Sequence, residues 1–334
     1  MGLSRVGAIT LESEEDYLYS ATLDQPNGFA YFGTFTSPAK IIKIQLSDFT
    51  RVGAIELPEL ERSLRTAVID QPNGFAYFGS NDSPGRITKI QLSNFTRVGV
   101  LTLNSGENYL RSSAIDLPNG FAYFMSYAFS GKLIKIRLSD FTRVSALSLS
   151  SGEDNVQSMV IDQPNGLLYL GTTTTPSRIV KINLSTFTRV GAITLQSGET
   201  FILEAVIDQP NGFAYFAMNK DPGMIVKIRL SDFTRIGAIT LPSGEIRPFT
   251  AVIDQPKGFA FFGTNQAPGK VIKIRLSDFT RIGAITMQSG ENNLLCVAAD
   301  LPKSLAYFGT PTYPGRVIKI KWGGRQMLSV MGMQ

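Results

Sequence analysis

Short runs of β-branched and aromatic residues alternate with polar, turn-forming residues along almost the whole chain. In one representative stretch the apolar runs cover residues 67–70, 75–79, 87–92 and 97–103. Segments rich in Gly, Pro, Asn, Asp and Ser separate them, and these residues supply turn dihedrals or cap turns. Apolar runs of this length between such turns are typical of β-strands. The pattern therefore predicts four short strands in this stretch.

The same arrangement recurs every 46 residues. A Phe-Thr-Arg motif follows the third strand of six copies, and Arg5 occupies the equivalent arginine position near the N-terminus. Four strands per unit, repeated seven times, predict an all-β fold, a seven-bladed β-propeller of four-stranded antiparallel blades. An Asp-x-Pro motif marks each copy, at Asp24, Asp70, Asp116, Asp162, Asp208, Asp254 and Asp300.

The two ends of the repeat array indicate how the ring closes. Residues 5–11 match a fourth strand, whereas the seventh copy stops after its third strand, at residues 317–322. We therefore predict that the N-terminal strand completes the last blade, which leaves no open end in the array. Residues 1–322 then form a single propeller domain. Residues 323–334 lie outside the repeat, and we expect a flexible C-terminal tail there.

Composition removes several classes of function. The chain has 334 residues, no histidine, one cysteine and a net charge of +5. It therefore has no His-ligated zinc, Ser/His/Asp triad or internal disulfide, and the small net charge does not favour nucleic acid as a partner. No apolar run approaches the roughly 18 residues of a membrane helix. We predict no cofactor, no metal site, no nucleic-acid partner and no membrane insertion.

The segment Asp-Gln-Pro-Asn-Gly-Phe-Ala-Tyr-Phe-Gly, which begins at Asp70, resembles the turn and aromatic strand of YVTN/NHL-type (WD-like) propeller repeats. The resemblance covers residues 1–322, although the chain contains neither the YVTN tetrapeptide nor the WD dipeptide. It implies a propeller that serves as a binding or structural platform. It also favours an extracellular or cell-surface location, although no signal peptide is visible in the chain.

Charged and aromatic residues also recur at the repeat period. Because blades stack face to face, we expect the repeated Asp, Lys and Arg side chains to form a network within each blade. The repeated tyrosines of the second strand are expected in the core between blades. The tyrosine series comprises Tyr31, Tyr77, Tyr123, Tyr169, Tyr215 and Tyr307, with Phe261 in the remaining copy.

Two segments differ in nearly every copy, unlike the rest of the unit. One precedes the first strand, and the other joins the second strand to the third. In a four-stranded meander these two connections emerge at the same edge, so both variable sets should share one face of the disc. The first set comprises residues 16–19, 62–65, 108–111, 154–157, 200–203, 246–249 and 292–295, and the second comprises 35–37, 81–83, 127–129, 173–175, 219–221, 265–267 and 311–313.

A rigid scaffold with variable loops is how many binding surfaces are built, and Tyr and Arg often anchor interfaces. We therefore predict a non-enzymatic binding or assembly scaffold that recognises a protein or a glycan through the variable loops around the central channel. The candidate ligand-binding residues are Tyr17, Tyr19, Arg65, Tyr109, Tyr127, Phe129, Arg111, Gln157, Arg247, Phe249 and Tyr313.

Two alternatives to this function remain open. In one, the ring is a purely structural building block of a surface layer or filament, with a possible homo-oligomer or higher assembly and no ligand. In the other, it is a hydrolase or lyase that uses carboxylates or tyrosines at the channel mouth. No asymmetric Asp/Glu pair stands out from the repeat pattern, which disfavours the enzyme.

Overall fold

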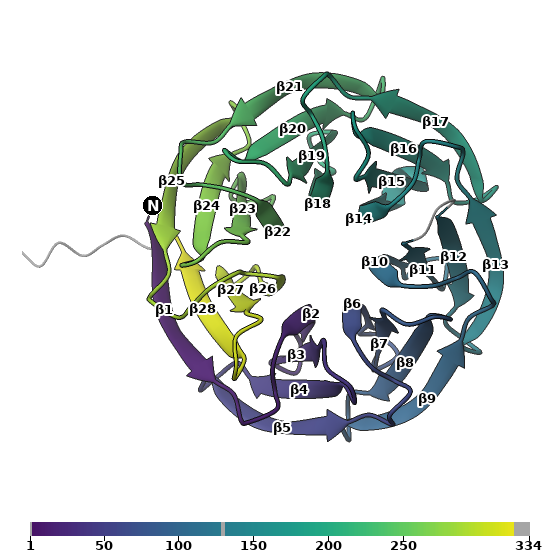
Figure 1. The fold of residues 1–334 in the computed structure, drawn as a ribbon, viewed down its shortest axis with the longest axis vertical. Coiled ribbons are helices and arrows are strands. Elements are labelled where there is room, and N and C mark those ends of the chain that lie inside the picture. Colours follow the sequence, from purple (N-terminus) through teal and green to yellow (C-terminus); the bar gives the residue numbers. More distant parts are fainter. Residues whose placement is uncertain (1, 128–130, 324–334) are drawn as a thin grey trace, which may run out of the picture.

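The computed structural model describes residues 2–127 and 131–323. It consists of seven four-stranded antiparallel sheets arranged as blades around a common axis (Figure 1). This confirms the predicted seven-bladed β-propeller. Within the described residues the only helical element is the short 3-10 turn η1 (Gln163–Asn165), and no helix is long and apolar enough to cross a membrane.

Each blade has an inner, a second, a third and an outer strand. The inner strands are β2 (Leu18–Asp24), β6 (Leu64–Asp70), β10 (Leu110–Asp116), β14 (Val156–Asp162), β18 (Ile202–Asp208), β22 (Pro248–Asp254) and β26 (Cys296–Asp300). The second strands are β3 (Phe29–Thr34), β7 (Phe75–Ser80), β11 (Phe121–Ser126), β15 (Leu167–Thr172), β19 (Phe213–Met218), β23 (Phe259–Thr264) and β27 (Leu305–Gly309).

The third strands are β4 (Lys40–Gln45), β8 (Arg86–Gln91), β12 (Lys132–Arg137), β16 (Arg178–Asn183), β20 (Met224–Arg229), β24 (Lys270–Arg275) and β28 (Arg316–Trp322). The outer strands are β5 (Thr50–Glu56), β9 (Thr96–Thr102), β13 (Thr142–Ser148), β17 (Thr188–Thr194), β21 (Thr234–Thr240), β25 (Thr280–Thr286) and, for the last blade, β1 (Leu3–Thr10).

The ring closes as predicted, because the N-terminal strand β1 is the outer strand of the last blade. It pairs antiparallel with β28, from Leu3 opposite Trp322 to Thr10 opposite Arg316. In Figure 1 the two ends of the array lie side by side, with β1 in purple against β28 in yellow. Of the predicted C-terminal tail at 323–334, residues 324–334 lie outside the described residues.

The repeated tyrosines are buried between blades, as predicted. Each ring packs against the phenylalanine of the Phe-Thr-Arg motif in the next blade, for example Tyr31 against Phe95 with 5.7 Å between centroids. The last blade reproduces the contact across the start of the chain, with Tyr307 against Phe49 at 5.7 Å. Aromatic pairs at this spacing add to the burial of apolar surface, so every such contact joins one blade to its neighbour.

The repeated charges form only part of the Asp/Lys/Arg network that we expected. Within a blade the aspartate attracts the lysine: burial lowers the pKa of Lys89, and Asp70 opposes that effect. Each arginine near the start of an outer strand instead pairs with a glutamate on the linker that leaves the preceding outer strand, as Arg51 does with Glu15. Guanidinium and carboxylate are matched for bidentate contact, which explains this choice of partner. The seven pairs are Arg5–Glu291, Arg51–Glu15, Arg97–Glu61, Arg143–Glu107, Arg189–Glu153, Arg235–Glu199 and Arg281–Glu245.

The repeated aspartates and lysines also have individual partners. Asp70 accepts hydrogen bonds from the side-chain amide of Asn73 in the following turn. Lys89 lies over the ring of Phe75, 3.7 Å from its centroid, and gains a cation–π contact. The aspartate is thus satisfied within its own blade, whereas Lys89 also lies 5.5 Å from the ring centroid of Phe141 in the next blade.

The two variable sets lie on one face, which we call the variable face. In the first blade the backbone N–H of Phe35 donates to the carbonyl of Tyr17 at 2.8 Å, and thus joins the two variable segments. Equivalent bonds connect Asn81 with Ser63 and Asn265 with Arg247. The prediction that both connections emerge at the same edge is confirmed.

Candidate binding site at the mouth of the channel

A β-bulge interrupts the inner strand of six blades near its start on the variable face. In β6 the pairing register shifts between Leu64 and Thr66, so that Arg65 has no partner of its own on β7. The sequence pattern had placed Arg65 in a loop, with the strand beginning at residue 67. Bulges redirect side chains and are common beside functional sites. The bulged residues are Tyr19, Arg65, Arg111, Gln157, Leu203 and Phe249.

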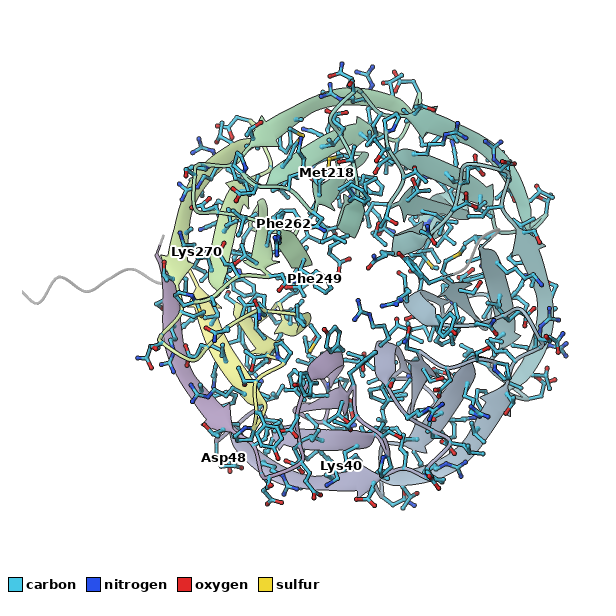
Figure 2. All side chains as sticks on the ribbon, viewed as in Figure 1. Lys40, Asp48, Met218, Phe249, Phe262 and Lys270 are labelled. Carbon is cyan, nitrogen blue, oxygen red and sulfur yellow. The ribbon has the colours of Figure 1, made fainter. Side chains whose placement is uncertain are left out.

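These bulged residues line one cavity of about 190 Å³ at the centre of the ring. Leu295 supplies the equivalent position of the seventh blade, just before β26. Phe249 lies at the inner edge of the ring, on β22 (Figure 2). Seven structurally equivalent positions thus carry five residue types around one cavity, and the mouth of the channel is chemically asymmetric.

Arg65 extends from its own blade over the aromatic side chains of others. Its guanidinium carbon lies 4.4 Å from the ring centroid of Tyr19 and 5.8 Å from those of Phe35 and Phe249. The rings of Tyr19 and Phe35 are themselves packed at 4.9 Å. Stacking on aromatic faces suits a guanidinium, so Arg65 is held in place although the cavity is open to solvent.

Arg111 is held in a similar way at the neighbouring blade. Its guanidinium carbon lies 4.6 Å from the ring centroid of Tyr127. Burial lowers the pKa of Arg111, and burial together with repulsion from Arg111 lowers the pKa of Arg65 to about 10. Both groups remain protonated at neutral pH. The mouth of the channel therefore holds two neighbouring positive charges at a cost in desolvation.

Glu204 is the only carboxylate among the described residues that line the cavity. Burial raises its pKa to about 8, against the opposing effect of a hydrogen bond from the backbone N–H of Ala205 at 2.9 Å. At neutral pH Glu204 is mostly protonated, so it does not neutralise the arginines. The equivalent residues in the other blades are Ser20, Thr66, Ser112, Ser158, Thr250 and Cys296.

The other predicted site residues lie outside this cavity. Tyr17 and Tyr109 are exposed on the rim, where both adopt a left-handed backbone conformation with φ of 51° and 56°. Arg247 has the same conformation in the sixth blade, and Tyr313 is exposed at the edge of the seventh. Phe129 lies outside the described residues. The structure thus brings together Tyr19, Arg65, Arg111, Gln157 and Phe249, with Tyr127 beside them, and their binding of a ligand stays a prediction.

Sequence reasoning missed several residues of this site, among them Leu203, Leu295, Phe35 and Glu204. Phe35 lies in the second variable set and supports both Tyr19 and Arg65, but a single aromatic residue in a loop gave no distinguishing signal. Glu204 could have been found, because it is the one charged residue in a series of Ser, Thr and Cys at the repeat period. A lone carboxylate does not match the pattern of a carboxylate pair, so the search for an Asp/Glu pair does not reveal it.

The geometry favours recognition of an anion over metal binding. Among the described residues, no group of three or more His, Cys, Asp or Glu side chains is placed to hold a metal ion. Two fixed guanidinium groups beside a neutral carboxyl and the amide of Gln157 can instead form charge-assisted hydrogen bonds to a negatively charged group. The site is therefore a small, cationic, aromatic-walled pit.

The fold and this pit define a seven-bladed β-propeller with an asymmetric channel mouth. Among solved structures, the chain is similar to a chain of Kuenenia stuttgartiensis hydrazine synthase, with a TM-score of 0.77 and 8% sequence identity over 93% of this chain and 97% of that one. At this identity the likeness shows the fold alone. No family model matches the sequence, and no curated protein matches it either.

Proposed function

We propose that this propeller is a non-enzymatic binding scaffold that recognises a protein or a glycan through the cavity at the channel mouth and the surrounding variable face. The observation that carries the proposal is the series of bulged inner-strand residues. The seven positions that begin with Tyr19 and Arg65 differ between blades, whereas the blade-to-blade contacts are nearly uniform. Different residue types at the equivalent positions around one cavity are expected when that cavity has a ligand to recognise.

Neutral drift of loops is the alternative explanation for such differences. Loops change freely because they are exposed, but Arg65, Arg111 and Phe249 lie on strands and face a shared cavity. Holding two arginines together there costs desolvation energy. A costly arrangement in a rigid part of the fold supports a role in binding.

Catalysis is not part of the proposal. Glycoside hydrolysis generally uses two carboxyl groups on opposite sides of the scissile bond, and the described lining of the cavity contains only Glu204. The YVTN/NHL-type resemblance and the extracellular or cell-surface location belong to the same proposal, because such propellers serve as platforms.

The test compares the parent protein with a variant in which Tyr19, Arg65, Arg111 and Phe249 are changed to alanine. Both are screened on a glycan array and in pull-down experiments, after thermal melting shows that both are folded. We expect the parent to retain a ligand that the variant loses. A matched control changes exposed Val98 and Val144 of the outer strands to alanine and should bind as the parent does.

Two results would count against the proposal. Equal binding by the parent and the cavity variant would place recognition elsewhere on the molecule. Absence of any ligand for the parent on the arrays and in pull-downs would leave the asymmetry of the cavity without a binding role.

A structural building block is the second candidate, and one feature favours it. The residue that follows the repeated arginine on each outer strand is a valine or isoleucine, and it is 40% to 52% exposed in all seven blades. Outer strands also present unpaired backbone groups at the rim of the disc, which invite association. The series is Val6, Val52, Val98, Val144, Val190, Ile236 and Ile282.

Sedimentation without any added ligand tests this candidate. If this series of exposed Val and Ile side chains drives lateral assembly, the parent should sediment as an oligomer, and a Val52→Lys, Val98→Lys, Val144→Lys variant should sediment as a monomer. The cavity variant should assemble as the parent does. A monomeric parent at all accessible concentrations would exclude the candidate.

A further inference from the structure

Unlike the seven arginines of the outer strands, Arg65 and Arg111 have no carboxylate partner among the described residues. The seven arginines of the outer strands each hold a glutamate, for example Arg143 with Glu107. At the channel mouth, by contrast, no ion pair to Arg65 or Arg111 is found within residues 2–127 and 131–323. The Nε atom of Arg111 is also buried without a hydrogen-bond partner in that part of the chain. A buried charged donor without a partner is costly, and a bound anion would relieve that cost.

The two guanidinium groups are also fixed before any ligand arrives. Arg65 stacks on Tyr19, and Arg111 stacks on Tyr127, at 4.4 Å and 4.6 Å from the respective ring centroids. Each guanidinium is therefore positioned by an aromatic ring, and the buried Nε of Arg111 has no hydrogen-bond partner among the described residues. Because the side chains are already ordered, little rotamer entropy is lost when they bind.

The net charge of the pit at neutral pH is positive. Glu204 is mostly protonated there, since burial raises its pKa to about 8. Its neutral carboxyl both donates and accepts hydrogen bonds, and so does the amide of Gln157. The pit therefore offers two cations together with two neutral groups that suit hydroxyl groups.

The size of the pit limits what can enter. A volume of about 190 Å³ lies below the roughly 300–1,000 Å³ of pockets for drug-sized ligands. It admits a single small residue, while the exposed rings of Tyr17, Tyr109 and Phe201 on the rim remain free to contact what extends outward. A sugar ring has an apolar C–H face that packs on an aromatic side chain and hydroxyl groups for polar partners.

We propose that the channel mouth binds an anionic sugar residue, alone or within an acidic glycan, with its carboxylate or sulfate group between Arg65 and Arg111. This rests on the proposed binding function and specifies its ligand class. An acidic peptide side chain would also contact the arginines, but it would leave Gln157 and Glu204 without hydroxyl partners. An anionic sugar offers hydrogen-bond partners to both arginines, to Gln157 and to Glu204.

The experiment measures the affinity of the full chain for three sets of oligosaccharides, one monosaccharide and one peptide. The oligosaccharides are uronate-containing, sulfated, and neutral with the same backbone. The monosaccharide is glucuronate, and the peptide is poly-glutamate. We expect the acidic glycans to bind at least about tenfold more tightly than their neutral counterparts. The preference should shrink as ionic strength rises, since ion pairing at a partly exposed site is screened by salt.

Paired variants separate a specific site from a general charge effect. The Arg65→Gln, Arg111→Gln variant should lose the preference for acidic over neutral glycans. The control variant Arg229→Gln, Arg275→Gln changes the net charge equally but removes exposed arginines that pair with Asp232 and Asp278 in turns between third and fourth strands. It should keep the preference. If the first variant does not fold, a competition experiment on the parent takes its place. Inorganic sulfate should then displace acidic glycans from the site.

The outcomes distinguish this inference from the wider function. Binding of neutral glycans or of a protein at the mouth, without preference for acidic glycans, would overturn the inference and leave the scaffold function standing. Tighter binding of poly-glutamate than of any glycan would replace the sugar by an acidic peptide and overturn it equally. Binding of nothing in any arm or pull-down would overturn both.

Discussion

Trp322 donates its indole N–H to the buried carboxylate of Asp254, at 2.6 Å, across the boundary between the sixth and seventh blades. Its ring also packs on Phe261, with 4.5 Å between centroids. At each of the other six boundaries a tyrosine packs against the phenylalanine of a Phe-Thr-Arg motif. At this boundary Phe261 stands in place of the tyrosine, and Leu3 stands in place of the phenylalanine. Trp322 thus fills the space of a missing phenylalanine at the point where the ring closes.

We expect Trp322→Leu to destabilise the protein by about 3 kcal/mol, since it leaves a cavity and removes a hydrogen bond from a buried carboxylate. Leucine is the residue of the other six copies at this position, for instance Leu276. The matched control is the triple variant Leu3→Phe, Phe261→Tyr, Trp322→Leu, which rebuilds the pairing of the other boundaries. It should recover most of the loss in chemical denaturation. Equal stability of the parent and the single variant would refute this account of the closure.

The ion pair between Arg5 and Glu291 closes the ring electrostatically. Burial alone would raise the pKa of Glu291, but hydrogen bonds from Arg5 and from the backbone N–H of Gln288 hold it below its ordinary value. Arg5→Ala leaves that carboxylate buried without its partner, and we expect a loss of about 2 kcal/mol. Because β1, unlike the other outer strands, does not follow the third strand of its blade in the chain, the loss should appear as faster amide exchange in β1 and β28.

The control for this experiment is Arg143→Ala, which removes the equivalent pair with Glu107 inside the array. There the neighbouring strands stay covalently connected, so exchange in β1 and β28 should remain as in the parent. Similar exchange profiles for the two variants would mean that the closing pair has no special role. The Glu291 contribution should also weaken at low pH, because a carboxylate with a lowered folded-state pKa loses its stabilising effect as the pH falls through that value.

Much of the architecture was predictable because the repeat exposes it. The 46-residue period, the turn residues and the unmatched fourth strand at residues 5–11 led to the blade number and to the closure. The site was less accessible. A β-bulge has no signature in the pattern of Arg65 and its neighbours, since it depends on pairing with β7. The partner of Arg51 was likewise misjudged, because the twist that brings it to Glu15 is a property of the assembled ring.

On the rim of the site, one residue in each blade has a backbone conformation that is unfavourable for most side chains. Seven equivalent residues have positive φ, among them Phe201 at 58° and Asn155 at 55°. Asparagine tolerates this conformation better than other non-glycine residues. Phe201 is 44% exposed, so packing of its ring offsets little of the free-energy cost of the positive φ. We expect Phe201→Asn to stabilise the protein by about 0.5–1 kcal/mol while weakening binding at the channel mouth.

The reciprocal change provides the control for the rim. Asn155→Phe places an aromatic residue at the equivalent position of the fourth blade and should destabilise the protein by a similar amount. Chemical denaturation of both variants measures the pair of effects. A loss of stability for Phe201→Asn would show instead that this ring is anchored by packing.

Glu204 should give the protein a distinctive pH dependence. Its pKa is about 8 in the folded state and 4.5 for an ordinary glutamate. Between these values the folded state holds a proton that the unfolded state has released, so the free energy of unfolding falls as the pH rises from about 4.5 to 8. Glu204→Gln removes this contribution. Between pH 5 and pH 9, we expect the free energy of unfolding to fall by about 2 kcal/mol more in the parent than in the variant.

Binding should follow the same titration. Above pH 8 the ionised Glu204 offsets part of the charge of the two arginines, so affinity for an acidic glycan should fall between pH 7 and pH 9 in the parent and stay level in Glu204→Gln. The other titratable groups lining the cavity are Tyr19, Arg65, Arg111 and Cys296. Burial raises the pKa of the Cys296 thiol, which keeps it neutral over this range, and Arg65 with a pKa of about 10 stays charged. A parent whose affinity does not change across pH 8 would show that Glu204 does not face the bound anion.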